Sequence, residues 1–180
     1  FLGQFWACHD RSIGRIVPMR FRPPFLLAAA SALLFISCGL LCPGSRAGNN
    51  FPARWLPLVR ALRLAGYDVR FENPPVSGAY GATNARKKIV WVAPISVQMG
   101  IGRQTLIHEA VHAAQACPTG KYETIGWSVT LPNAVDRSIE GILYRKYPHK
   151  KFPVEREAFF MQSHPNAFAE VINALKQRCR

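Results

Sequence analysis

Hydrophobic and polar residues follow two different periods along this chain, and these periods predict which segments form helices and which form strands. The period of an amphipathic helix recurs in several segments, residues 67–71 alternate as a half-buried strand does, and residues 88–93 form a short, mostly apolar run that ends at Pro94. We expect helices over 51–64, 95–116, 135–147, 154–163 and 167–175, and strands over 67–71 and 88–93. Few short strands combined with several helices predict a small α+β domain.

Glycine and proline residues punctuate this pattern and set the expected boundaries. Gly66 ends the first helix, and Gly78, Gly81 and Asn84 mark turns between the two strands. A turn at residues 100–102 leaves it open whether the helix over 95–116 is continuous.

The first part of the chain has the pattern of a secretory leader. Arg20 and Arg22 precede an almost wholly apolar run over 25–42, and a small residue suited to cleavage follows this run. These features predict a signal peptide over 19–47, with residues 1–18 as an over-extended gene start. The mature protein is then exported, either to the periplasm or out of the cell.

Two other interpretations of the leader stay open. The apolar run of about 18 residues is at the lower limit for an uncleaved transmembrane anchor. Cys38 could carry a lipid, although the residues before it match a lipid-attachment site poorly. Either alternative would keep the domain at a membrane surface.

Residues 48–180 are enough for one domain with a core of its own.

The whole chain carries a formal charge of +13. The first 47 residues hold five Arg and one Asp, a net +4, which leaves +9 for this domain. Such a charge suggests an anionic envelope surface as a partner, although a solvated basic face is the simpler explanation. The basic residues form no nucleic-acid motif, and export argues against a nucleic-acid partner. The sequence gives no indication of the oligomeric state.

The cysteines agree with export. Removal of the leader leaves two of the five, Cys117 and Cys179. An even pair in an oxidising compartment favours one disulfide, worth about 4 kcal/mol for so long a loop. Two unpaired buried thiols are the alternative.

The segment over 105–114 carries the clearest chemistry of the chain. It contains His108, Glu109 and His112 as His-Glu-x-x-His within a run of good helix formers. Residues four apart lie on one helix face, so both imidazoles can bind one zinc ion. Glu109 lies beside that face, where a general base can reach a water on the metal. A helix with two partly buried histidines and a surface glutamate is the bland alternative.

This motif resembles the signature of the zincin metallopeptidases. Gln115 and Pro118 stand where the metzincin branch has Gly and a third His, so the chain does not match that branch. Its Glu-x-x-Ala segment, with Glu155 and Ala158, is similar to the gluzincin pattern. The resemblance implies that Glu155 is the third zinc ligand on a second helix, with Glu157 as the alternative.

The chain also departs from that pattern. Phe159 occupies the position where small gluzincins have the Asp or Asn that braces a motif histidine, so this bracing is absent or comes from elsewhere. Further candidates for the third ligand or for a donor to the transition-state oxyanion are Glu123, Glu140, Tyr144, Tyr147, His149 and His164.

The resemblance implies an activity and a substrate class. A gluzincin-like zincin would hydrolyse peptide bonds of a peptide or protein substrate with Zn²⁺ as cofactor, and the strand over 88–93 would be the edge strand that holds the substrate. The alternative is an inactive zincin-like scaffold that acts as a basic envelope-binding or structural module.

Overall fold

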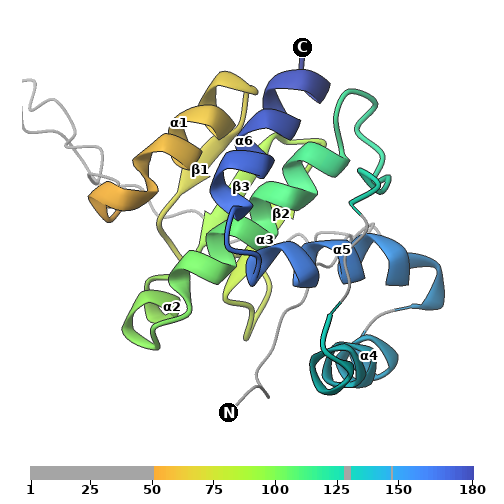
Figure 1. The fold of residues 1–180 in the computed structure, drawn as a ribbon. Coiled ribbons are helices and arrows are strands. Elements are labelled where there is room, and N and C mark those ends of the chain that lie inside the picture. Colours follow the sequence, from red (N-terminus) through yellow and green to blue (C-terminus); the bar gives the residue numbers. More distant parts are fainter. Residues whose placement is uncertain (1–50, 128–130, 147) are drawn as a thin grey trace, which may run out of the picture. The chain divides into compact units, whose positions relative to one another are not determined.

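The fold is a mixed α+β domain, as the sequence predicts. The computed structural model describes residues 51–127, 131–146 and 148–180. In this part of the chain, six α-helices accompany one sheet of three short strands (Figure 1). The expected signal peptide over 19–47 and the expected over-extended start over 1–18 lie outside the described residues. No described helix is both long enough and apolar enough to span a bilayer.

The sheet has the strand order β1-β3-β2. Strand β1 (Asp68–Arg70) pairs in parallel with β3 (Ile89–Val92), and β2 (Gly81–Asn84) pairs with β3 in the antiparallel direction. Val90 lies opposite Val69 on one side and opposite Thr83 on the other. β3 is therefore the central strand, with β1 and β2 at the two edges.

The helices gather around the segment that carries the histidine motif. This helix, α3 (Gly102–Gln115), packs against β2 and β3 and also contacts α5 (Phe152–Gln162) and α6 (Ala167–Arg178). α1 (Leu56–Leu64) packs on α6 and β1, while α4 (Asn133–Lys146) packs on α5 (Figure 1). A helix enclosed in this way is buried on nearly all sides, unlike an amphipathic surface helix.

The hydrophobic core forms mainly where α1, α3 and α6 meet the sheet. Its members include Leu58, Leu62, Val69, Val90, Leu106, Val111, Val171 and Leu175. A second, smaller cluster joins α4 to α5 through Ile139, Leu143 and Phe159. Both clusters bury apolar surface around α3 and α5, and this burial holds the two helices in place.

The structure differs from the sequence expectation at two points. Residues 81–84 form a strand where the sequence suggests only turns, because Ala82 and Thr83 are buried against α3 rather than exposed. The helix expected over 95–116 is two helices, α2 (Pro94–Gln98) and α3. Gly100 separates them with a φ of +76°, a conformation that few other residues adopt.

A disulfide joins Cys117, just after α3, to Cys179, just after α6, with a sequence separation of 62. The structure thus has the pairing that the sequence left open. Arg178 adds a second link between the same two helices, since its Nε donates to the carbonyl of Ala114 at 3.0 Å. The C-terminal end of α3 is therefore fixed on α6 by a covalent bond and a hydrogen bond.

Candidate metal site

Helix α3 places both motif histidines on one face, directed toward α5. Apolar residues and alanines surround them on the helix, so packing rather than local polarity fixes this orientation. The Nε2 atoms of His108 and His112 lie 3.1 Å apart, and their rings meet nearly edge to face. The two nitrogens thus converge on one point, as the spacing of the motif predicts.

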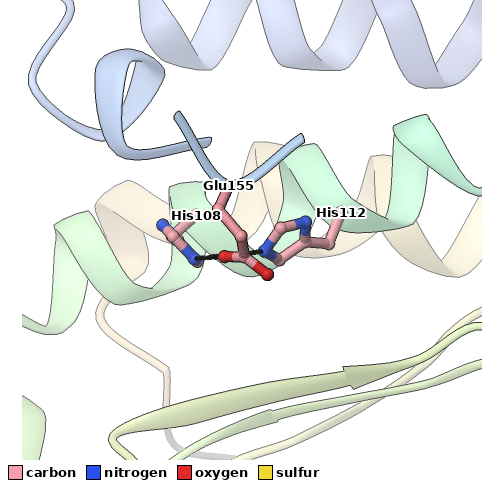
Figure 2. A group of neighbouring side chains, drawn as sticks. All are labelled: His108, His112 and Glu155. Carbon is pink, nitrogen blue, oxygen red and sulfur yellow. Dashed lines mark hydrogen bonds and ion pairs between the residues drawn. The ribbon is translucent and has the colours of Figure 1, made fainter. Parts of the chain in front are cut away.

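Helix α5 brings a carboxylate to the same point (Figure 2). Glu155 lies in the first turn of α5, and Ala158, one turn later, is fully buried where α5 contacts α3. Oε2 of Glu155 is 3.3 Å from Nε2 of His112 and 3.6 Å from Nε2 of His108. The three side chains form one buried group that could hold a metal ion.

The dimensions of this group fit a tetrahedral metal ion. The three ligand atoms form a triangle with edges of 3.1, 3.3 and 3.6 Å. A tetrahedral zinc ion with bonds of 2.0–2.1 Å separates its ligands by about 3.3–3.4 Å. Oε2 of Glu155 is buried and makes no well-formed hydrogen bond with the described residues, although buried carboxylate oxygens normally have such a partner. A cation bound by the three atoms would satisfy this oxygen.

The protonation of the group also suits a metal. Burial lowers the pKa of His108 to about 4, against the opposing effect of Glu155, so this ring is neutral near pH 7. Burial alone would raise the pKa of Glu155, but electrostatic attraction by His112 and the close approach of both imidazoles outweigh this effect and hold the pKa below its usual range. A neutral imidazole and an ionised carboxylate are the forms that bind metals.

Glu109 lies next to this group on α3 but points toward the sheet. Its carboxylate is buried, and the hydroxyl of Thr83 on β2 lies 2.8 Å from its Oε2. Burial raises the pKa of Glu109 to about 7, and the nearby His112 opposes part of this rise. A carboxyl group that titrates near neutral pH can both take and return a proton.

Phe159 stands in place of a bracing residue and has an apolar role. Its ring packs against the ring of His108 with the centroids 4.9 Å apart, and it belongs to the cluster between α4 and α5. The partner of His112 comes from its own helix, because Oε1 of Gln115 lies 2.7 Å from Nδ1 of His112. His108 interacts in turn with the side chain of Gln162. Two glutamines thus contact the two histidines.

Glu157, the alternative third ligand, has a different set of partners. Its carboxylate accepts hydrogen bonds from the backbone N–H groups of residues 125–127 and from the side chain of Gln115. It is not a member of the group formed by the two histidines and Glu155.

The other candidates for the third ligand or for an oxyanion donor do not belong to the group of His108, His112 and Glu155. Glu123 is exposed, Glu140 is 3.5 Å from Arg156, and His164 is 3.5 Å from Glu170. Tyr144 and His149 are exposed, and their rings pack against each other and against the half-buried ring of Phe152. Tyr147 lies outside the described residues.

The expectation that the strand over 88–93 is a free edge is wrong, because β3 pairs on both of its sides. The edge strand beside Glu109 is β2. Tyr122 covers part of this strand, since its hydroxyl donates to the carbonyl of Thr83 at 2.8 Å. The centroid of its ring lies 5.8 Å from that of the His112 ring. Sequence reasoning missed Tyr122, Thr83 and Gln115, since their roles depend on contacts that no local pattern signals.

The group is closed to solvent in this conformation. The exposed fractions of His108, Glu109, His112 and Glu155 are 0, 1, 1 and 2%. A surface hollow of about 330 Å³ is lined in part by Glu157, Gly126 and Trp127, but by none of the four residues of the site. Access to the metal position therefore requires movement of covering side chains.

Comparisons of the chain with models of protein families, with curated proteins and with solved structures found no match.

Proposed function

We propose that this protein is a zinc-dependent peptidase. The observation that carries the proposal is the buried triangle of His108, His112 and Glu155, whose edges suit tetrahedral zinc, with the carboxyl group of Glu109 beside it. Two imidazoles and one carboxylate leave one coordination position open, which is typical of catalytic rather than structural zinc sites. The disulfide between Cys117 and Cys179 supports the proposal that the protein acts in an oxidising, extracytoplasmic compartment.

The residues of the chain have distinct tasks in this proposal. Bound zinc would supply a Lewis acid that polarises a peptide carbonyl and lowers the pKa of a water molecule to about 7. Glu109 takes the proton of the attacking water and returns it to the leaving amine, for which a pKa of about 7 is suitable. Thr83 orients the carboxyl group of Glu109, and the surrounding apolar side chains exclude bulk water.

The burial of the site supports a second candidate function. Both histidines and Glu155 are at most 2% exposed. In this second candidate function, a metal bound here has a purely structural role in a basic, envelope-binding module. The number of protein ligands argues the other way, since structural zinc sites are usually closed by four protein ligands and this group offers three. Hydrolysis of peptides separates the two functions, since the structural module would bind zinc without cleaving them.

The metal content of the purified protein tests the proposal. We expect one zinc per chain in the wild type and a loss or strong weakening of binding in His112→Ala and Glu155→Gln. Glu123→Gln changes an exposed carboxylate and serves as the control that keeps the metal. A wild type that binds no zinc after reconstitution would sink the proposal. Zinc that is kept by Glu155→Gln but lost by His112→Ala would show that Glu155 is not the third ligand.

A further inference from the structure

Glu157 is a buried carboxylate, and the mechanism described above does not use it. Only 7% of the residue is exposed. Oε1 accepts from the backbone N–H groups of Gly126 and Trp127 at 2.7 and 3.0 Å, and Oε2 accepts from that of Ile125 at 2.8 Å. The side chain of Gln115 donates to Oε2 as well, also at 2.8 Å. With four donors directed at two oxygens, Glu157 acts only as an acceptor.

The orientation of the Gln115 amide follows from this arrangement. Its Nε2 lies between two acceptors, Oε2 of Glu157 at 2.8 Å and the carbonyl oxygen of Val154 at 2.9 Å. A flipped amide would place its own oxygen against both of these oxygens, with no proton between them. The amide therefore directs Oε1 away from Glu157, toward Nδ1 of His112 at 2.7 Å.

The tautomer of His112 follows in turn. An amide oxygen can only accept, so the short contact requires that Nδ1 of His112 carries the proton and donates it. In the neutral ring, Nε2 then has a lone pair, and this is the nitrogen that faces His108 and Glu155. The neutral ring thus presents to this point the nitrogen lone pair that a metal needs.

We propose that Glu157 is a positioning residue that sets the tautomer of His112 through Gln115. Its significance for metal binding rests on the zinc site proposed above, whereas the tautomer itself is a property of the metal-free protein. The chain of contacts also accounts for the missing brace at Phe159, because Gln115 and Glu157 supply the support for a motif histidine that an acidic residue at that position would give. Glu157 has a second structural task, since it anchors residues 125–127, and two of these, Gly126 and Trp127, line the hollow described above.

Nitrogen-15 NMR of the imidazoles tests this proposal directly, because it distinguishes a proton on Nδ1 from one on Nε2. The full chain without metal is measured near pH 8.5, about two units above the ordinary pKa of histidine. We expect the Nδ1–H form of His112 in the wild type. In Gln115→Met, which keeps the size of the side chain but removes the acceptor, the Nδ1–H form should lose its preference. Gln104→Met changes another glutamine of the same helix and should leave His112 unchanged.

Zinc affinity provides the second measurement. We expect Gln115→Met and Glu157→Gln to bind zinc about 10- to 100-fold more weakly than the wild type, although neither residue is a ligand. Glu123→Gln and Gln104→Met should bind zinc as the wild type does. A thermal melt of each variant separates a local loss of affinity from a loss of folding.

Several outcomes distinguish the two proposals. A wild-type His112 with its proton on Nε2 would overturn the role of Glu157 whether or not any variant folds. A folded Gln115→Met with unchanged tautomer and unchanged zinc affinity would overturn it as well. An Nδ1–H His112 that is lost in Gln115→Met, in a protein that binds no zinc, would support the tautomer relay while refuting the peptidase proposal.

Discussion

The hydroxyl of Thr83 lies between two oxygens of Glu109, 2.8 Å from Oε2 of its carboxyl group and 2.9 Å from its backbone carbonyl. A hydroxyl has one proton, so it cannot fully donate to both. If Thr83 donates to the carbonyl, a protonated Glu109 can donate to Thr83, and every group has a partner. Burial raises the pKa of Glu109 to about 7, although the hydrogen bond from Thr83 to the carboxylate acts to lower it. Strand β2 and helix α3 thus meet at a carboxyl group that titrates near neutrality.

The first prediction concerns the stability of the metal-free protein as a function of pH. Because the folded pKa of Glu109 is about 7, against an ordinary value of 4.5, the folded state binds this proton more tightly than the unfolded state. The resulting stabilisation is complete below pH 4.5 and is lost as the pH rises through 7. The titration of Glu109 should therefore lower the free energy of unfolding by roughly 3 kcal/mol between pH 4.5 and about 7. The lowered pKa of His108, about 4, has the opposite effect on stability. It reduces the free energy of unfolding as the pH falls below the ordinary value of 6.5.

The difference between wild type and Glu109→Gln isolates this effect, since the contribution of His108 is common to both. Chemical denaturation at several pH values should show the wild type losing stability relative to Glu109→Gln between pH 4.5 and about 7, the window set by the two pKa values. Glu123→Gln should follow the wild type. Parallel curves for wild type and Glu109→Gln would show that the pKa of Glu109 is not raised.

The second prediction separates catalysis from metal binding. Glu109→Gln removes the proton acceptor but none of the three proposed ligands, so zinc binding should stay within a few-fold of the wild type. Peptide hydrolysis should fall by about 10²- to 10⁴-fold, the usual contribution of a general base. Cleavage of a peptide mixture, followed by mass spectrometry, measures the loss. Undiminished cleavage by the zinc-loaded variant would exclude Glu109 as the base.

The third prediction tests the close contact between β2 and α3. A Cβ atom at Gly81 would lie 2.7 Å from Cγ2 of Thr105 and 2.8 Å from Cγ and Oε1 of Glu109. Gly81→Ala should therefore lower the free energy of unfolding by about 1–3 kcal/mol through overpacking. Gly141→Ala is the matched control. Its nearest neighbours are side-chain atoms of Arg145 at 3.7 Å and beyond, and it lies in helix α4, so it should stabilise the protein by up to about 1 kcal/mol. Equal effects of the two variants would contradict the close packing.

Local patterns predicted more of the helices than of the sheet. The segments of α1, α4, α5 and α6 have apolar residues at helical spacing, and the α+β class follows from them together with the alternation around β1 and the short apolar run of β3. Strand β2 was missed because Gly81, Ala82 and Asn84 are poor strand formers, and only their burial against α3 makes this segment a strand.

Some residues of the candidate site can be predicted from local spacing, whereas others come together only through tertiary contacts. His108, Glu109 and His112 are visible because one helical turn sets their spacing. Glu155 was proposed from a resemblance, and only the contact between α3 and α5 brings it to the histidines. Gln115 was seen only as a departure from a known pattern. Its partner Glu157 lies 42 residues away, a relation that one sequence cannot reveal.

The last prediction concerns the disulfide between Cys117 and Cys179. It closes a loop with a sequence separation of 62, for which the loop-entropy model gives about 4 kcal/mol. The double variant Cys117→Ala/Cys179→Ala should lose a comparable free energy of unfolding but keep its fold, because Val171 and Leu175 of α6 stay in the core and Arg178 still donates to the carbonyl of Ala114. Urea denaturation with and without a reductant measures this. Reduction should lower the wild-type midpoint to that of the variant and leave the variant unchanged, whereas a wild type insensitive to reductant would show that the bond contributes nothing to stability.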